Sequence, residues 1–402
     1  MFDELLTRGV EAIYPNKEFL EKKLAGGKPI SIYLGIDPTG PTLHLGHATV
    51  LNKLKKFQEL GHKVILLIGD FTATIGDPDK LSVRVPLSKE QVHKNAKLYK
   101  KQASIFLKFS GKNKAELVYN SAWLAKMRFE EILNVLSKTT VDQILKREMF
   151  QRRVAENRPI YLHEFLYPVM QGYDSVVLDV DGEIGGNDQT FNMLTGRALM
   201  KELLGKEKFV MTMKLLVDPD GKKMGKTEGN MITLTDSPAE MFGKVMSWSD
   251  GMIVSAFELC TDVDTHKIDN IKKELVTGAN PRDIKMRLAR EIVTVYHGEK
   301  EAKKAEEDFV DTFSKGGVPD EMPGVTVSPG AALADVLLGQ KIIKSKTDWR
   351  RLIKDGAVNI VSHGDYGPNG DSNQKITDPL FVVMKTATFK VGKRRFIKVL
   401  VK

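Results

Sequence analysis

Two histidines three positions apart, His44 and His47, are the first side chains whose spacing points to chemistry. Residues three apart on a helix share one face, so the two imidazoles would project together. Gly46 between them has no side chain and lets a ligand approach the backbone. A helix N-terminus adds unpaired N–H groups and partial positive charge. The HLGH stretch, residues 44–47, therefore predicts a site for a nucleoside triphosphate, with two ordinary surface histidines as the alternative.

The segments on either side of HLGH predict the strand, turn and helix that would position it. Residues 30–36 are short, β-branched and mostly apolar, as expected for a buried strand. Residues 46–60 carry leucines and a phenylalanine at three-residue steps, which is typical of a helix, and Gly61 stands where it would end. The turn between them, residues 38–41, contains two prolines and a glycine.

A second motif, KKMGKT at residues 222–227, has lysines on both sides of a glycine. Such a loop could close on a polyphosphate, although on its own a lysine-rich loop is usually only solvated. The two motifs together are specific. They resemble the signatures of class I aminoacyl-tRNA synthetases, with HLGH for HIGH and KMGKT for KMSKS. Gly225 stands where many members have serine, which removes one hydroxyl and keeps both lysines.

The composition is that of a folded globular chain with a sizeable core. Of its 402 residues 42% are hydrophobic and 28% are charged, which fits two or three domains. No apolar run reaches the length of a membrane span, and the acidic N-terminal residues do not resemble a signal peptide. The single cysteine, Cys260, cannot form an internal disulfide and is predicted to be buried. These features favour a cytoplasmic protein with no membrane partner.

The positive charge is concentrated near the C-terminus. Residues 329–402 hold 14 Lys and Arg against 6 Asp and Glu, so this stretch carries +8 of the net +9. Such an asymmetry points to a nucleic-acid partner for the C-terminal part of the chain.

The first half of the chain predicts an α/β fold. Residues 63–68 (KVILLI) are nearly all apolar, as in a central parallel strand, and they complete a βαβ unit with residues 30–36 and 46–60. A helix over residues 89–109 and a strand over residues 117–119 extend it. We expect a Rossmann-like doubly wound parallel sheet whose ligand binds beyond the carboxyl ends of the strands.

Further helices and strands are predicted around this unit. Residues 1–28 look helical, and so do the charged residues 121–158, either as a solvated layer or as a subunit contact. Residues 176–180 and 209–216 are predicted strands, separated by a helix that begins at the GGNDQ stretch, residues 185–189. The predicted domains are a catalytic domain (1–217), the KMGKT loop and its connection (218–235), a helical domain (236–314), a linker (315–330) and a C-terminal domain (331–402).

The C-terminal domain is predicted to be a small α+β RNA-binding domain. Two short helices would end at Gly339 and Gly356 and precede strands, which resembles the RNA-binding fold first described in a ribosomal small-subunit protein. A generic basic helical hairpin is the alternative, and the polar loop at residues 362–377 departs from the compact strand order. The resemblance implies a phosphate-binding face made by Lys344, Lys346, Arg350 and Arg351.

Within class I, the sequence is most similar to the tyrosyl-tRNA synthetases, over essentially the whole chain, and the helical domain then corresponds to their anticodon-binding domain. By this resemblance Tyr33 and Asp174 hydrogen-bond the substrate phenol, and phenylalanine would leave both groups buried and unpaired. The resemblance places Asp188 near the ribose of ATP. An aspartate at a helix start is about as often a simple N-cap, and this alternative stays open for Asp188. The resemblance assigns the α-ammonium of tyrosine to Asp77, Tyr167 and Gln171, its carboxylate or the α-phosphate to Gln189, and ATP to Gly35, Asp37, His44, Gly46, His47, Gly186, Asp188 and Lys226.

The implied reaction is attack of the tyrosine carboxylate on the α-phosphate of ATP, followed by transfer of the tyrosyl group to the 3′ end of tRNA(Tyr). The nucleophile is already ionised, so the first step requires positioned donors rather than a general base. Mg²⁺ is expected with ATP, without a permanent cofactor or a cluster of protein metal ligands, and a homodimer is expected. The implied donors are Thr39, His44, His47, Lys223, Lys226 and Thr227.

Three alternatives stay open from the sequence. A tryptophanyl enzyme shares the fold and the reaction but gives no reason for Asp174 opposite Tyr33. A small-molecule nucleotidyltransferase also uses HxGH but does not need the helical domain or the basic C-terminal domain. An RNA-binding or RNA-modifying protein would leave HLGH and KMGKT unexplained.

Overall fold

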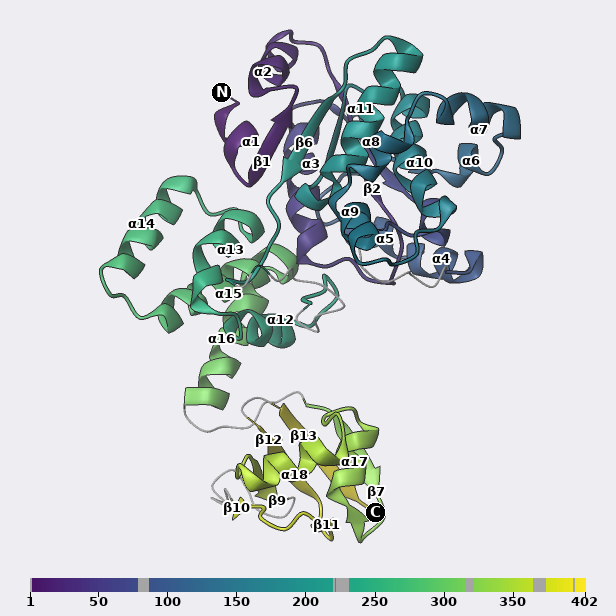
Figure 1. Cartoon of the computed structure of the whole chain (residues 1–402). Coiled ribbons are helices and arrows are strands. Elements are labelled where there is room, and N and C mark those ends of the chain that lie inside the picture. The colour runs from purple at the N-terminus through teal and green to yellow at the C-terminus, as the bar shows by residue number, and fades with distance from the viewer. Residues whose placement is uncertain are drawn as a thin grey trace. The chain divides into compact units, whose positions relative to one another are not determined.

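The computed structural model describes residues 2–78, 87–219, 221, 231–314, 322–363, 374–392 and 395–402. The chain forms two compact units, residues 1–302 and 303–402, which are described separately (Figure 1).

A six-stranded sheet forms the centre of the first unit. Its order is β1-β6-β5-β2-β3-β4, and all neighbouring strands run parallel except the edge pair β1 and β6. The order reverses between β5 and β2, which creates the switch point of a doubly wound sheet. The α/β prediction is therefore confirmed for this unit. The strands are β1 (Val10–Tyr14), β2 (Ser31–Ile36), β3 (Lys63–Ile68), β4 (Glu116–Tyr119), β5 (Gly182–Gly186) and β6 (Phe209–Met213).

Three long helices position the predicted site residues against this sheet. Helix α3 (Leu45–Glu59) follows β2 and packs on β2 and β3. Helices α10 (Leu162–Leu178) and α11 (Thr190–Leu204) lie against each other, and α11 also contacts β5 and β6. The two helices approach closely at Gly172 and Gly196, where a Cβ on Gly172 would lie 3.1 Å from the Cα of Gly196.

Three predictions of secondary structure are wrong in part. Within residues 1–28, helices α1 (Asp3–Thr7) and α2 (Lys17–Ala25) flank strand β1, because that segment pairs with β6 at the sheet edge. The predicted strand at residues 176–180 is the end of α10, which stops where Asp179 adopts a left-handed conformation. A short β-branched run does not distinguish a buried strand from a buried helix. The predicted helix at residues 89–109 is two shorter helices, α4 (Lys89–Ala96) and α5 (Tyr99–Ala103).

Residues 121–158 form a layer of short helices, as predicted. This layer and the start of α10 expose six large apolar side chains. They are Phe129, Leu133, Val141, Val154, Tyr161 and Leu162. The helices are α6 (Ser121–Leu124), α7 (Phe129–Leu136), α8 (Val141–Leu145) and α9 (Glu148–Ala155).

The helical prediction for residues 236–314 is also confirmed. Figure 1 shows helices α12 to α15 gathered without strands among them. The Arg8 guanidinium donates hydrogen bonds to the carbonyl oxygens of Phe257, Thr261 and Val263 around the end of α13, which ties the N-terminus to this region. Cys260 is buried there, and burial raises the pKa of its thiol to about 12. The helices are α12 (Pro238–Met246), α13 (Ile253–Cys260), α14 (Thr265–Val276), α15 (Pro281–His297) and α16 (Glu299–Ser314).

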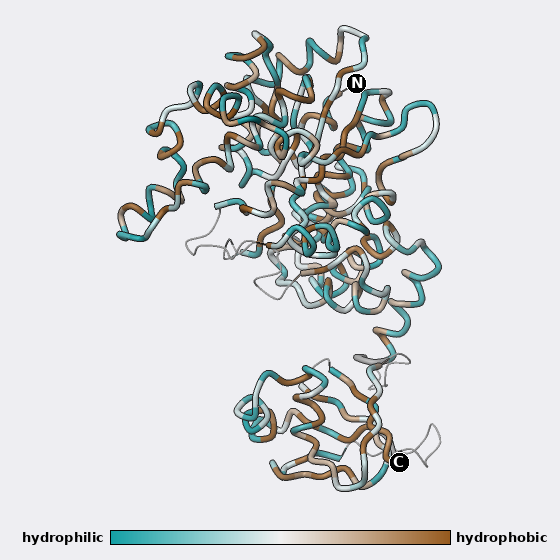
Figure 2. The backbone as a smooth tube through the Cα atoms, turned by 90° about the vertical axis from the view of Figure 1, so that its right-hand side faces the viewer, coloured by the Kyte–Doolittle hydropathy of each residue, from teal (hydrophilic) through white to brown (hydrophobic). Residues whose placement is uncertain are grey.

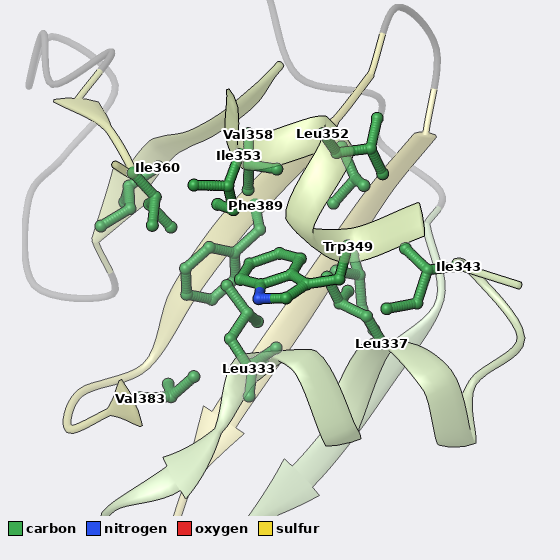
Figure 3. Close-up of a cluster of buried hydrophobic side chains, with 14 of the residues drawn as sticks. Leu333, Leu337, Ile343, Trp349, Leu352, Ile353, Val358, Ile360, Val383 and Phe389 are labelled. Atoms are coloured by element: carbon green, nitrogen blue, oxygen red, sulfur yellow. The ribbon is translucent and has the colours of Figure 1, made fainter. Parts of the chain in front are cut away.

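The second unit combines a five-stranded sheet of order β10-β9-β12-β13-β7 with two helices. Figure 3 shows Trp349 of α18 beside Leu333 and Leu337 of α17 and Phe389 of the sheet, in one apolar core. The elements are β7 (Gly324–Val327), β8 (Ala331–Ala332), α17 (Leu333–Gly339), α18 (Lys346–Lys354), β9 (Val358–His363), β10 (Gln374–Lys375), β11 (Val382–Val383), β12 (Ala387–Val391) and β13 (Arg395–Val401).

Two predicted boundaries change in this unit. Part of the predicted linker, residues 315–330, is strand β7, which pairs in parallel with β13. The predicted loop at residues 362–377 is shorter at both ends, because β9 reaches His363 and β10 begins at Gln374. Residues 364–373 lie outside the described part of the chain.

Hydrophobic and hydrophilic segments alternate along the backbone tube in Figure 2. Among the described residues, no helix is long and apolar enough to cross a membrane.

Candidate active site

The two histidines of HLGH lie at the N-terminus of α3, and their rings are 3.9 Å apart between centroids. Nδ1 of His44 accepts a hydrogen bond from the backbone N–H of Gly46 at 3.1 Å, and Nδ1 of His47 accepts from the N–H of His44 at 3.2 Å. A neutral imidazole that accepts at Nδ1 carries its hydrogen on Nε2. Both histidines can therefore donate a hydrogen bond from Nε2 to a ligand.

Burial keeps both imidazoles neutral at physiological pH. It lowers the pKa of His44 from 6.5 to about 4. The pKa of His47 is lowered well below its ordinary value, first by burial and second by the neighbouring His44. The pair thus offers neutral hydrogen-bond donors rather than two positive charges.

The backbone N–H groups of this helix end are not unpaired, contrary to the prediction. Leu45 N–H donates to the Ile232 carbonyl at 3.1 Å, His47 N–H donates to the His44 carbonyl at 2.9 Å, and Gly46 N–H donates to the His44 ring. The space beside Gly46 is also occupied, because a Cβ there would lie 2.9 Å from Cε1 of His44. This end of the helix therefore presents its imidazoles to a ligand rather than its backbone.

The second motif lies outside the described residues, including Lys223, Lys226 and Thr227. The segment that follows it is held against the first motif. Thr233 forms a bridge with His44, and Leu234 N–H donates to the Leu43 carbonyl at 3.0 Å. The chain therefore returns from the lysine-rich stretch directly beside HLGH.

Tyr33 and Asp174 are both buried, on β2 and α10 respectively. Asp174 is 2% exposed and accepts hydrogen bonds from Asn120 Nδ2 at 3.1 Å and from Trp123 Nε1 at 2.8 Å. Burial raises the pKa of Asp174, and these two bonds oppose that change. Burial and the charges of Glu183 and Asp174 raise the pKa of Tyr33, so its hydroxyl stays protonated. A hydroxyl and a carboxyl group thus lie near each other in the buried interior, beside the polar side chains of Ser175 and Glu183.

Asp77 and Gln189 are brought together, because Gln189 Nε2 donates to Asp77 at 2.8 Å. Arg147 at the start of α9 was not predicted; its Nη2 donates to Asp77 at 2.6 Å. Arg147 is 8% exposed, and its Nη1 has no hydrogen-bond partner among the described residues. Nothing in the sequence marked this arginine, because it lies in a helical layer with many other charges.

A second hydrogen-bonded group joins α10 to the end of β2. Tyr167 donates to Asp37 at 2.9 Å, and Thr72 donates to the other oxygen of the same carboxylate at 2.7 Å. Asp37 therefore contacts Tyr167, which was predicted to bind tyrosine, although Asp37 itself was predicted to bind ATP. Gln171, one turn along α10, donates to Glu183 at 3.3 Å.

The remaining predicted ATP residues, and the predicted catalytic donor Thr39, lie at the carboxyl ends of β2 and β5. Gly35 and Thr39 are exposed, one near the end of β2 and the other in the turn after it. Gly186 ends β5, and a Cβ there would lie 2.6 Å from Oδ1 of Asp188, which is exposed. These residues share the sheet edge that carries HLGH.

The predicted RNA-binding residues are exposed on the second unit. All four, Lys344, Lys346, Arg350 and Arg351, are accessible to solvent. Two of them form ion pairs: Lys346 with Asp335 at 2.9 Å and Arg351 with Asp348 at 2.7 Å. An ion pair as exposed as Lys346–Asp335 contributes little stability.

Comparison with known proteins agrees with this geometry. The family model of the class I tRNA synthetases (W and Y) matches residues 25–314. The tyrosine–tRNA ligase of Carboxydothermus hydrogenoformans is 44% identical over 412 residues, covering 99% of this chain and 97% of that protein. The tyrosine–tRNA ligase of Haemophilus ducreyi is 44% identical over 400 residues, with the same coverage of 99% and 97%.

Solved structures agree as well. A C-terminally truncated mitochondrial tyrosyl-tRNA synthetase of Coccidioides posadasii aligns with a TM-score of 0.61 and 25% identity, over 75% of this chain and 89% of that one. The chain therefore belongs to the W and Y family of class I tRNA synthetases, among the tyrosine–tRNA ligases.

Proposed function

We propose that this chain activates L-tyrosine with ATP and transfers the tyrosyl group to the 3′ end of tRNA(Tyr), and that its predicted site residues carry out these steps. The observation that carries the proposal is the buried pair of Tyr33 and Asp174. Asn120 and Trp123 donate to Asp174, which holds its oxygens as acceptors. A substrate phenol placed there donates its hydrogen to Asp174 and accepts one from Tyr33. An indole or a phenyl ring cannot satisfy both groups.

The α-ammonium of tyrosine binds near Asp77, Tyr167 and Gln171. Asp77 supplies the negative charge, and Gln189 holds that carboxylate from the other side. Because Arg147 forms an ion pair with Asp77, the ammonium must share or replace this pair. Gln189 is then close to the substrate carboxylate and the α-phosphate.

The chemical step uses positioned donors. The substrate carboxylate attacks the α-phosphate, and pyrophosphate leaves with the electron pair of the broken P–O bond. The neutral Nε2–H groups of His44 and His47 donate to phosphate oxygens as charge moves onto them. Thr39, Lys223, Lys226 and Thr227 supply further donors, and lysines that tighten on departing pyrophosphate favour the transition state over the ground state. Gly35, Asp37, Gly46, Gly186 and Asp188 surround the nucleotide.

Magnesium enters with the nucleotide as a salt of ATP. Within the ranges that the structure describes, no group of three His, Cys, Asp or Glu residues is arranged to hold a metal ion. When bound with ATP, Mg²⁺ would neutralise charge on the phosphates.

The helical region of residues 236–314 and the C-terminal unit bind the tRNA, the former at the anticodon. The +8 charge of residues 329–402 supports this assignment, since Lys and Arg residues that neutralise phosphates provide much of nucleic-acid affinity. Because charged tRNA is consumed by translating ribosomes, the enzyme acts in the cytoplasm.

A homodimer forms through the catalytic domain, at the helical layer of residues 121–158 and the start of α10. Six large apolar side chains are exposed there, among them Leu162 at 81% and Phe129 at 73%. Exposed apolar residues gathered in one region mark interaction surfaces. A second copy of the chain would cover them.

Amino-acid-dependent pyrophosphate exchange tests the proposal. With ATP, Mg²⁺ and each amino acid in turn, and without tRNA, only tyrosine should support rapid exchange. Exchange with tryptophan would favour the tryptophanyl alternative. A failure of every amino acid to support exchange would favour a nucleotidyltransferase. A charging assay with purified tRNA(Tyr) then tests the second step.

A further inference from the structure

A buried ion pair lies behind the proposed phenol site and is not used by the reaction described above. Lys208 is 0% exposed and Glu183 is 2% exposed, and the Lys208 ammonium donates to Glu183 Oε2. Lys208 also donates to Ser175 Oγ at 2.7 Å, and Ser175 Oγ lies 2.8 Å from the Tyr33 hydroxyl oxygen. A continuous hydrogen-bonded chain thus joins Lys208 to Tyr33.

The fold makes room for this lysine in particular. A Cβ on Gly196 would lie 2.8 Å from Lys208 Nζ and 2.9 Å from Ser175 Oγ, so any side chain at position 196 would collide with both. The ammonium lies 5.8 Å from the centroid of the Tyr33 ring. A buried charge is costly, and replacing a buried ion pair by apolar residues is often neutral or stabilising. Stability alone therefore does not account for it.

Hydrogen-bond counting gives the pair a role. A lysine ammonium has donors only, so Ser175 must accept from Lys208 and retains a single hydrogen to donate. That hydrogen can go to Tyr33 at 2.8 Å or to Glu183 at 3.4 Å. Accepting a hydrogen bond from the ammonium polarises the Ser175 hydroxyl, which makes it a stronger donor and a weaker acceptor, and the Tyr33 contact is the shorter of the two. This arrangement favours donation from Ser175 to Tyr33, with the Tyr33 hydrogen directed to the substrate.

We propose that Lys208, acting through Ser175, orients the Tyr33 hydroxyl so that it donates to the phenol oxygen of bound tyrosine. Asp174 can only accept while it is ionised, and a phenol has one hydrogen to give. A Tyr33 that pointed its own hydrogen at Ser175 would meet the phenol with a second acceptor. Lys208 and Ser175 are thus positioning residues for tyrosine recognition, an inference that rests on the proposed role of Tyr33.

The first test is Ser175→Ala, which removes the link and keeps the Lys208–Glu183 pair. We expect the KM for tyrosine in pyrophosphate exchange to rise roughly three- to tenfold with little change in kcat, since one hydrogen bond of recognition is weakened. The KM for phenylalanine should not change. Equal losses for both amino acids, or no loss for either, would show that the serine has only a packing role.

The second test removes the charges together, in Lys208→Met/Glu183→Gln, so that no unpaired charge stays buried. Without Lys208, no ammonium polarises the Ser175 hydroxyl, so Ser175 accepts more readily from Tyr33 and the Tyr33 hydrogen turns away from the substrate. This variant should lower the tyrosine-to-phenylalanine ratio of kcat/KM at least as much as Ser175→Ala. Combined with Ser175→Ala it should add little, because both changes act through one chain of bonds. Full additivity would contradict the proposal.

Two controls separate the possible failures. Lys53→Met removes another buried lysine, which donates to the Leu5 carbonyl at 2.6 Å. This variant should leave the tyrosine-to-phenylalanine ratio of kcat/KM unchanged. Tyr33→Phe should lower the ratio by itself. If Tyr33→Phe has no effect, the proposed role of Tyr33 is wrong. If it lowers the ratio but the Ser175 and Lys208 variants do not, only the inference about Lys208 fails.

Discussion

Asp174→Asn should reduce the preference for tyrosine by an amount that the geometry allows us to bound. The carboxylate of Asp174 accepts from Asn120 and Trp123 and is proposed to accept the phenol hydrogen as well. Hydrogen bonds to charged groups contribute about 1.5–3 kcal/mol. The kcat/KM for tyrosine should therefore fall by about 10- to 150-fold. Phenylalanine makes no such bond, so its kcat/KM should stay within about threefold and the ratio should narrow accordingly.

The same substitution should be mild for stability. An asparagine has one acceptor oxygen, so either Asn120 or Trp123 loses its partner, at a cost of about 1–3 kcal/mol. Removing a buried carboxyl group whose pKa is raised by burial offsets part of that cost. We expect a net loss below about 2 kcal/mol, which urea unfolding can measure.

Steady-state pyrophosphate exchange with each amino acid gives the ratio. Asp181→Asn is the matched control, because the Asp181 carboxylate also accepts hydrogen bonds, one of them from the backbone N–H of Ser31 at 2.9 Å, but Asp181 precedes β5 at the opposite end of the strands. An unchanged ratio in Asp174→Asn, or an equal change in Asp181→Asn, would refute the assignment of Asp174 to the phenol.

Three further predictions concern acid stability, assembly and tRNA. The pKa of His44 is about 4 in the folded chain, below its ordinary 6.5, so the unfolded state binds more protons and stability rises with pH across this window. The variant His44→Asn lacks this group, so the stability of the wild type relative to it should fall by up to about 3 kcal/mol between pH 7 and pH 4 in urea unfolding. Light scattering at micromolar concentration should give the mass of two chains for the wild type and for Val276→Glu, but of one chain for Phe129→Glu/Leu162→Glu. Deleting residues 322–402 should leave tyrosine activation intact but raise the KM for tRNA and weaken the dependence of this KM on salt concentration. Charging of tRNA at the full rate across salt concentrations would contradict this prediction.

The sequence was sufficient to predict helices and strands where one periodic hydrophobic pattern dominated. The apolar run Lys63–Ile68 and the three-residue steps that lead to Leu60 predicted β3 and α3 closely, because burial on one strand or one helix stripe decides such segments. It failed at Val10–Tyr14, whose conformation depends on pairing with β6 far along the chain. It also failed at the end of α10, where β-branched residues continue a helix because tertiary packing overrides local preference.

The sequence suggested candidate site residues, but it did not indicate the hydrogen bonds that these residues make. The spacing of His44 and His47 indicated two donors, but it did not indicate that both rings cap their own helix through Nδ1. Arg147 and Lys208 gave no signal, since one lies among many charged helical residues and the other precedes an apolar strand. Each acquires its role from a partner distant in sequence, Asp77 for the former and Glu183 for the latter.

The edge strand β1 has a consequence for how the chain is completed on the ribosome. Among the described strands its neighbour in the sheet is β6, where Val10 pairs with Met213, and Arg8 binds carbonyl groups 249 to 255 residues further along. At roughly 5–20 residues per second, a nascent chain extends for about 10 to 40 seconds before β6 exists. The first strand to be synthesised is thus among the last to dock, and the exposed edge of the sheet stays open to other chains until α13 has left the exit tunnel.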